Sequence, residues 1–308
     1  MNIIRATKIW LGISSVLVVV ALVCIFTFRY HLGIDFAGGT VLEVETGEIG
    51  PTSLPAGNAS VDQYLTLTYK ASTNEEAVAQ RAGENHFMLR SKTISNDQKN
   101  AWLDGARAVL PQIKELRFET VSPVLGGEVV RKAVMAVIVA VLAILLYLAY
   151  AFRRVPKPTN SWRFGVTAVV ALLAHDVIIL LGIYAVLGRF FGAEVDSMFI
   201  TALLTLLGFS VHDTIVTYDR LRENLIKRGA ANFEQTVNDS IVETITRSIN
   251  TTFTLALVLL AMTLMGGRST FFFTLSLLIG VILGTYSSIF VASPLLLLWH
   301  KAAEKRGA

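Results

Sequence analysis

The stretch "HDTIVTYDR" at residues 212–220 places a carboxylate, Asp213, in an apolar run that begins near Met198. A charged side chain at the centre of a bilayer costs about 2.5–3.5 kcal/mol on insertion scales, so it needs a partner or a water-filled cavity. Two further apolar runs carry ionisable residues, Asp176 beside His175 in one and Arg247 in the other. A carboxylate that alternates between an arginine-paired, charged form and a neutral form can relay protons.

Asp213 and Arg247 are predicted to lie at matched depth in two successive membrane helices. From the helical rise, Asp213 lies about 24 Å from the first residue of its span and Arg247 about 27 Å from the last residue of the next. Each belongs to a polar stripe with helical spacing. The stripes are Ser210, Asp213 and Thr217, and Thr244, Arg247, Thr251 and Thr254. We predict a hydrophilic seam in which Asp213, Arg247 and Thr251 relay protons; an ion pair that only fixes helix packing is the alternative.

Three other residues are candidates for either a relay or a structural role, namely Asp176, His212 and Asp219. Asp176 lies near the middle of an otherwise apolar helix, where a neutral, hydrogen-bonded carboxyl is at least as reasonable as a relay. Asp219 belongs to a charged segment typical of a helix at the membrane surface.

No enzymatic or metal chemistry is indicated by the motifs. His175 and His212 have no accompanying H-E-x-x-H pattern or cysteine cluster, so we predict no metal site and no cofactor. The segment "GFSVH" lacks the last glycine of a nucleophile elbow, and an intramembrane protease using Asp176 and Asp213 would need a GxGD-type motif, which is absent. We therefore predict that the protein is not an enzyme.

The composition is that of an integral membrane protein. Of 308 residues, 53% are hydrophobic and 16% are charged, against about 25% charged in an average soluble domain. Runs of about 20 apolar residues are long enough to span a bilayer. Six spans are predicted, at residues 9–28, 132–152, 164–187, 197–217, 243–265 and 271–299. The last has small residues every four positions, which allow close approach of a helix from this chain or a partner.

Basic residues in the short loops predict the orientation. The segment "RRVPKPTNSWR" between the second and third spans and the segment "DRLRENLIKRG" after the fourth are basic. The positive-inside rule then places both termini in the cytoplasm and residues 29–130 outside it, although Arg131 and Lys132 run against the trend. The chain is divided into residues 1–28, 29–130 and 131–308. Despite a pI of about 9.2, no compact basic patch with interleaved aromatic residues predicts nucleic-acid binding.

Residues 29–130 are predicted to form a small extracytoplasmic α+β domain of the ferredoxin-like type. Alternation predicts strands in "TVLEVE", "QYLTLTY", "HFMLRS" and "LRFETV". Helices are predicted in "TNEEAVAQRA", capped by Thr73 or Asn74, and in "NDQKNAWLDGARAVL", capped by Asn96 or Asp97. The Gly-, Pro- and Ser-rich segment 47–60 is predicted to be a mobile loop.

Several motifs together resemble the SecD/SecF family of protein-export membrane proteins, and SecF in particular. They are "LGIDFAGGT" (32–40), "VSPVLGGEV" (121–129), "AHDV" (174–177), "HDTIVTYDRLREN" (212–224), "TRSINTT" (246–252) and "GTYSSIFVASP" (284–294). The resemblance runs along the chain in the family's order; Ser122, where the family usually has glycine, is one departure. The glycines Gly33, Gly38 and Gly39 are expected to allow a tight exit from the first span, and Asp35 to cap or brace that turn.

The resemblance implies a six-helix membrane bundle equivalent to half of a transporter of the resistance-nodulation-division superfamily. It implies an accessory subunit that couples the proton-motive force to late-stage export of preproteins through the SecYEG channel, in the bacterial cytoplasmic (inner) membrane. A separate SecD-like chain is implied as partner. The family's relay carboxylate, arginine and threonine fall on Asp213, Arg247 and Thr251. The alternative is a self-contained proton-driven exporter of small molecules or lipids.

Overall fold

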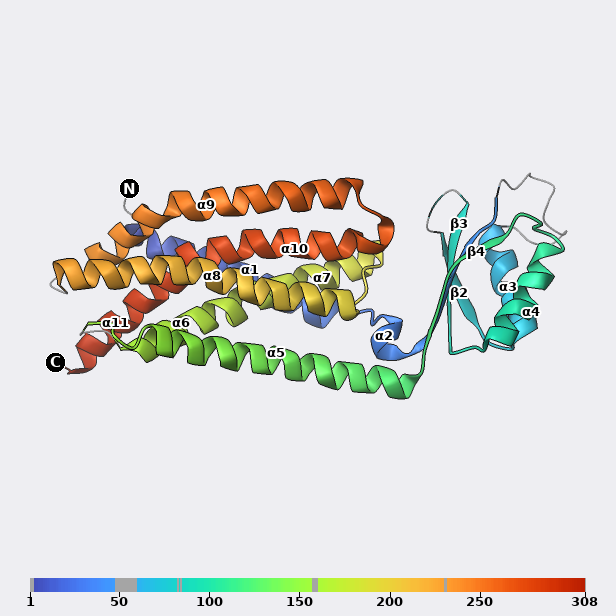
Figure 1. The fold of residues 1–308 in the computed structure, drawn as a ribbon, viewed down its shortest axis with the longest axis horizontal. Coiled ribbons are helices and arrows are strands. Elements are labelled where there is room, and N and C mark those ends of the chain that lie inside the picture. Colours follow the sequence, from blue (N-terminus) through green and yellow to red (C-terminus); the bar gives the residue numbers. More distant parts are fainter. Residues whose placement is uncertain are drawn as a thin grey trace. The chain divides into compact units, whose positions relative to one another are not determined.

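The computed structural model describes residues 3–47, 60–81, 83, 85–156, 160–229 and 232–307. The chain divides into two compact units, one made of residues 1–31 and 133–308 and the other of residues 32–132. Figure 1 shows the first as a bundle of long helices and the second as a small sheet with helices on it. The predicted loop at 47–60 lies almost wholly outside the described residues.

Six helical segments of the described residues are long and apolar enough to cross a membrane, which confirms the predicted spans. The first is α1 (Thr7–Phe28), preceded by the short 3-10 helix Ile4–Ala6, and the second is α5 (Pro123–Ala151). The third joins α6 (Ser161–Ala171), the π-helix η2 (Leu172–Val177) and α7 (Ile178–Phe191). The fourth and fifth are α8 (Ser197–Arg228) and α9 (Phe233–Met265). The sixth joins α10 (Arg268–Ser287), the π-helix η3 (Ser288–Ala292) and α11 (Ser293–Gly307).

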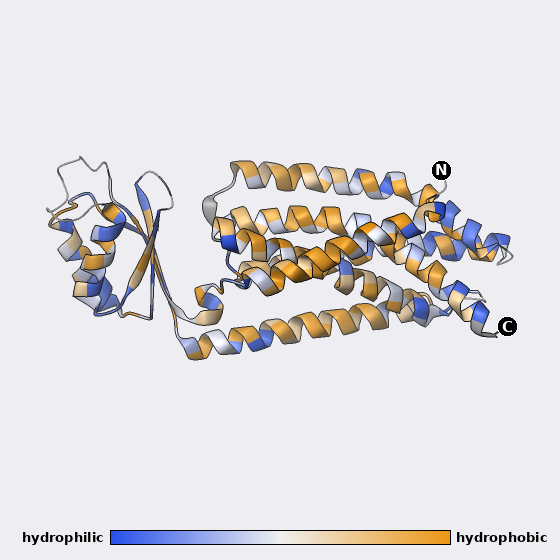
Figure 2. Cartoon of the chain, turned by 180° about the vertical axis from the view of Figure 1, so that it is seen from behind, coloured by the Kyte–Doolittle hydropathy of each residue, from blue (hydrophilic) through white to orange (hydrophobic). Residues whose placement is uncertain are grey.

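Helices α8 and α9 extend beyond the predicted spans and form a polar hairpin at one end of the bundle. Arg228 pairs with Asp239 at 2.6 Å, and Asn224 donates a hydrogen bond to Ser240 at 3.0 Å. Figure 2 shows hydrophilic residues concentrated at this end, near both termini, and hydrophobic residues along the rest of the helices. The hairpin therefore continues both helices out of the apolar layer.

The third, fourth and sixth spans form the centre of the bundle. About half or more of the most apolar stretch of each is buried, against 11% in the first span and 6% in the second. The small residues of α10 belong to this core: a Cβ on Gly280 would lie 3.0 Å from Leu206 Cδ1, and one on Gly284 would lie 2.9 Å from Ser210 Cβ. The small-residue stripe thus packs, at these two positions, against α8 of the same chain, which settles what the sequence left open.

The second unit is a small α+β domain, as predicted, and its elements follow the βαββαβ order of a ferredoxin-like domain. The short α2 (Ile34–Ala37) leads into β1 (Gly39–Glu45), α3 (Val61–Thr73), β2 (Ala77–Arg81), β3 (His86–Ser91), α4 (Asn96–Arg107) and β4 (Lys114–Val121). The sheet order is β2-β3-β1-β4 with antiparallel neighbours. Its core joins Leu42 and Leu89 of the sheet to Tyr69 and Trp102 of the two helices.

Two of the predicted elements in this unit were wrong. Residues 63–69, predicted as a strand, lie in α3, where Tyr64, Leu65 and Tyr69 are buried on one helical face and Ser60 caps the start. Residues 77–81, predicted as helix, form the edge strand β2, and Asn74 instead ends α3 in a left-handed conformation. Tertiary packing overrode weak local preferences in both. The cap of α4 is Ser95, in a capping box with Gln98, rather than Asn96 or Asp97.

Candidate functional site

Asp213 is buried in the middle of α8, with 2% of the residue exposed. The Thr285 hydroxyl of α10 donates a hydrogen bond to Asp213 Oδ2 at 2.9 Å. Thr285 is also hydrogen-bonded to Thr252 of α9. A chain of two hydroxyl groups therefore leads from the buried carboxylate to a half-exposed residue on the neighbouring helix.

Helix α9 carries a row of hydroxyl groups that faces α8 and α10. Ser248 is buried, its hydroxyl has no hydrogen-bond partner of good geometry, and it lies close enough to Asp213 to interact with the carboxylate. One turn away, the hydroxyls of Thr217 and Thr244 lie 3.3 Å apart. The inward-facing row of α9 is thus Thr244, Ser248 and Thr252, each four residues from the next.

Arg247 lies on a different face of α9. It is exposed, and no ion pair within 4.0 Å joins it to a carboxylate in the described part of the chain. Thr251 is exposed as well, and its hydroxyl donates to the backbone carbonyl groups of Arg247 and Ser248 at 3.0 Å.

The structure therefore divides the stripe predicted on the fifth span. Thr244 faces the core, whereas Arg247, Thr251 and Thr254 are exposed. The sequence reasoning missed Ser248, Thr252 and Thr285. The four-residue spacing of Thr244, Ser248 and Thr252 is a sequence signal for this inward-facing row. The stripe that contains Arg247 also has helical spacing, and its charged residue made it the more conspicuous of the two.

Asp176 occupies a separate, fully enclosed polar cluster. Ser210 of α8 donates to Asp176 Oδ2 at 2.5 Å and Ser287 of α10 donates to the same oxygen at 2.8 Å. His175 Nδ1 lies 2.8 Å from Oδ1, and the side chains of both residues are at most 3% exposed. Two hydroxyl donors and an imidazole nitrogen thus surround a carboxyl group that has no contact with solvent.

The Asp176 cluster lies in the π-helical turn η2 and extends to the first span. The His175 ring stacks on Tyr286, with ring centroids 5.3 Å apart. Tyr286 Oη lies 3.2 Å from Ser14 Oγ of α1 and donates to the Trp10 carbonyl group at 3.3 Å. The cluster therefore connects four of the six spans, and π-helical turns of this kind occur often at functional sites.

The two carboxyl groups are held by the same pair of helices. On α8, Ser210 binds Asp176 and lies three residues from Asp213; on α10, Ser287 binds Asp176 and lies two residues from Thr285, which binds Asp213. A shift of α10 against α8 would disturb both groups together.

The remaining candidates lie at the surface of this unit. His212 is exposed on α8, next to the buried Asp213. Asp219 is half-exposed and pairs with Arg222 at 2.9 Å. No group of three or more metal-ligating side chains occurs among the residues described.

The face of α8 that carries His212 exposes polar or small residues where a lipid-facing helix would expose apolar ones. Its exposed residues are Thr201, Thr205, Gly208 and His212, which recur with helical spacing. Helix α9 exposes Arg247, Asn250, Thr251 and Thr254. A Cβ on Gly208 would meet nothing within 4 Å, so this part of the face is open. Such residues are unsuited to lipid contact, and polar faces of spanning helices usually meet protein or water.

The turn after the first span uses two of its three glycines for backbone freedom. Gly38 and Gly39 have φ values of +73° and +126°, and a Cβ would meet Pro123 and Ser91 backbone atoms at 2.6–2.7 Å. Gly33, at φ −66°, needs no such freedom and precedes α2, whose first turn contains Asp35.

Comparison with known families gives two matches. The family model described as protein export membrane protein SecD/SecF, C-terminal, matches residues 103–302, and the SecD/SecF GG motif matches residues 25–48. The second match contains the turn with Gly33, Asp35, Gly38 and Gly39. The first contains Asp176, Asp213 and Arg247.

Similar proteins and structures cover nearly the whole chain. The protein translocase subunit SecF of Thermobaculum terrenum is 38% identical over 303 residues, covering 97% of this chain and 94% of that one. The SecF subunit of Anaerolinea thermophila is 37% identical, covering 100% and 98%. A crystal structure of SecDF from Thermus thermophilus, described as a translocon-associated membrane protein, matches with a TM-score of 0.79 and 31% identity. It is matched over 98% of this chain, which spans only 39% of that longer chain.

Proposed function

Because the chain belongs to the SecD/SecF family of protein-export membrane proteins, we propose that it couples the proton-motive force to protein export together with SecD. It is a multi-pass SecF subunit of the protein translocase, a transport protein and not an enzyme. The proposed setting is the bacterial cytoplasmic membrane, with both termini in the cytoplasm and residues 29–130 outside it. The proposed partners beyond SecD are the SecYEG channel and the translocating preprotein.

The environment of Asp213 is the observation that carries the proposal. Among the described residues Thr285 is the one donor that bonds this carboxylate with good geometry, whereas Asp176 has three close hydrogen-bond partners. A buried carboxylate with unused acceptor sites and an unpartnered hydroxyl beside it is suited to gain and lose a proton. The hydroxyls of Thr285 and Thr252 offer a route to the edge of the bundle.

The second part of the proposed cycle concerns Arg247. We propose that its side chain turns from the exposed face of α9 toward Asp213 when that carboxylate is charged, and is released when the carboxylate is protonated. A potential of 100 mV supplies about 2.3 kcal/mol per elementary charge. That shifts a two-state equilibrium about fiftyfold. The movement of α8, α9 and α10 would then drive the unit of residues 32–132.

The exposed polar faces of α8 and α9 support a SecD subunit as the partner. An arginine, an asparagine and two threonines facing lipid would be costly. A second protein that supplies polar groups or a water-filled crevice there would remove this cost. We propose that SecD covers the face formed by His212, Gly208, Arg247 and Thr251. A self-contained exporter is disfavoured because the relatives are translocase subunits.

Reconstitution tests the proposed function. The chain, SecD and SecYEG in vesicles with the ATP-driven motor should export a preprotein faster when a proton gradient is imposed. Omitting this chain should remove the stimulation and leave the ATP-driven rate. Equal rates with and without the gradient in the complete system would contradict the proposal.

Asp176 is proposed to be a structural anchor that fixes α8 against α10. In Asp176→Ala, Ser210 and His175 lose their buried hydrogen-bond partner, whereas Ser287 keeps the Gly284 carbonyl group as acceptor at 3.1 Å. Each buried polar group left unsatisfied costs about 1–3 kcal/mol. We expect a lower unfolding temperature of the purified chain, with a smaller loss in Asp176→Asn, which keeps one acceptor oxygen. Folded Asp176→Asn should retain proton-stimulated export; loss of the stimulation in folded protein would instead place Asp176 in the relay.

A further inference from the structure

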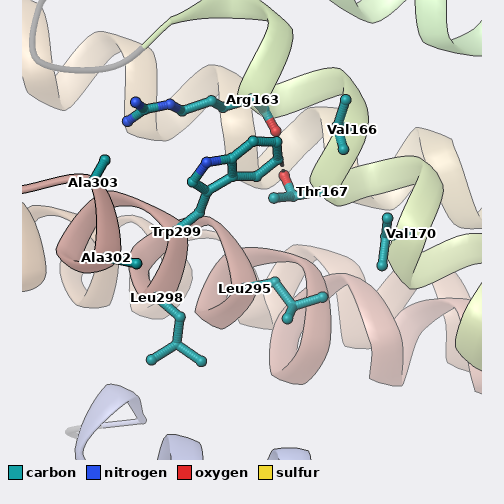
Figure 3. Close-up of a pocket in the computed structure, with 9 residues that line it drawn as sticks. All are labelled: Arg163, Val166, Thr167, Val170, Leu295, Leu298, Trp299, Ala302 and Ala303. Carbon is teal, nitrogen blue, oxygen red and sulfur yellow. Dashed lines mark hydrogen bonds between the residues drawn. The ribbon is translucent and has the colours of Figure 1, made fainter. Parts of the chain in front are cut away.

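A groove lies between α6 and α11, away from both carboxylate clusters. It has a volume of about 740 Å³, within the range of about 300–1,000 Å³ typical of small-molecule sites. Its lining residues are Arg163, Val166, Thr167 and Val170 of α6 and Leu295, Leu298, Trp299, Ala302 and Ala303 of α11. Each set recurs at helical spacing, so one face of each helix forms one wall (Figure 3).

The chemistry of the walls changes along the groove. Arg163 and Ala303 lie at the end nearest the termini, and Val170 and Leu295 lie at the other. Seven residues separate Arg163 from Val170, which corresponds to about 10 Å along α6. Figure 3 shows the Trp299 ring between α11 and Arg163, and the Arg163 guanidinium carbon lies 6.0 Å from the centre of that ring. The groove thus has a cationic, aromatic end and an apolar end.

The cationic end has no acidic partner in the described residues. Arg163 makes no ion pair there, while Glu304 of α11 pairs with His300 at 3.2 Å and Glu234 pairs with Lys301 at 2.6 Å. The described residues just before α6 include two further arginines, Arg153 and Arg154, and no acidic residue. An anion at this end would therefore meet positive charge.

Exposure indicates that the groove opens to the surroundings of the bundle. Val170 is 44% exposed, Leu298 43% and Trp299 37%. An apolar wall beside an unpaired arginine and an interfacial tryptophan suits a molecule with an anionic head and a hydrocarbon tail. A free phosphate or a nucleotide would leave Val166, Val170 and Leu295 without an apolar partner.

We propose that this groove binds an anionic phospholipid of the leaflet on the side of the termini. The phosphate group lies at Arg163 and Trp299, and an acyl chain runs along Val166, Val170 and Leu295. This site is independent of the proton relay, since none of its residues contacts Asp213 or Arg247 through a described hydrogen bond or ion pair.

Native mass spectrometry of the purified full chain tests the proposal. Phosphatidylglycerol should bind more tightly than phosphatidylcholine with the same acyl chains. One basic residue near a membrane surface contributes about 1 kcal/mol, so Arg163→Gln should weaken phosphatidylglycerol binding about fivefold. Arg189→Gln is the matched control, because Arg189 is an exposed arginine at the opposite end of the third span.

Two further experiments test whether the lipid binds in this groove and whether its acyl chain takes part. Ala302→Phe, which fills the groove, should weaken both lipids, and brominated phosphatidylglycerol should quench the fluorescence of Trp299 as judged against Trp299→Phe. Equal binding of the two lipids, or equal effects of Arg163→Gln and Arg189→Gln, would overturn the proposal. Competition by inorganic phosphate as strong as that by phosphatidylglycerol would show an anion site without a lipid chain, and an unchanged affinity in Ala302→Phe would exclude the groove.

Discussion

Asp213→Asn is expected to abolish the proton-dependent part of export while leaving the amount of protein in the membrane unchanged. Asparagine is close to the neutral form of the side chain in shape, and its amide oxygen can still accept the hydrogen bond of Thr285, so folding should be preserved. It cannot gain or lose a proton at neutral pH. With a proton gradient imposed on vesicles that contain SecD and SecYEG, the rate should fall to the rate without a gradient.

Asp219→Asn is the matched control for this variant. It makes the same change six residues further along α8, at a half-exposed carboxylate that pairs with Arg222, and it should keep the stimulation. If Asp213→Asn exported preprotein at the wild-type rate under the gradient, Asp213 would be a packing residue.

Arg247→Met is expected to have an effect of similar size. Methionine keeps an unbranched side chain but removes the positive charge that pairs with the ionised Asp213. Without that pairing, the proposed alternation between charged and protonated Asp213 would stop. Arg247→Lys should recover part of the stimulation, because a lysine keeps the charge but not the planar guanidinium group. The measurement is again gradient-stimulated export, with the chain and SecD copurified to verify their association.

Copurification separates two roles of Arg247. A variant that still binds SecD but has lost the stimulation supports the relay, whereas a variant that no longer binds SecD assigns Arg247 to the interface. Arg222→Met, at an arginine of α8 that pairs with Asp219, is the control and should change neither readout. A mild effect of Arg247→Met on both readouts would break the proposed pairing with Asp213.

The membrane bundle could be predicted from the sequence because its signal is strong. Six apolar runs, basic loops and polar residues at helical spacing all follow from the cost of burying charge in hydrocarbon. The fold class of the α+β unit was predicted correctly, but one helix was predicted as a strand and one strand as a helix. The segment around Tyr64 and Tyr69 has strand-like residues, and only its packing on the sheet makes it a helix.

The sequence predicted the central carboxylate of the candidate site, Asp213, but only some of the residues that surround it. Asp213 is conspicuous as a charge in an apolar run, but which face of α9 meets it depends on the rotation of that helix. A rotation of one residue exchanges Ser248 for Arg247. Thr285 lies on α10, and its contact with Asp213 accompanies the close helix approach at Gly284. The small-residue stripe predicted a close approach there but did not specify α8 as the helix that makes it.

Proton movement through Asp213 is the central claim, and a proton-flux measurement tests it most directly. Vesicles that contain the chain with SecD, loaded with a pH-sensitive dye, would be given a proton gradient in the presence of an engaged preprotein. The account predicts a flux in the wild type and in Asp219→Asn that is absent in Asp213→Asn. An undiminished flux in folded Asp213→Asn would contradict it.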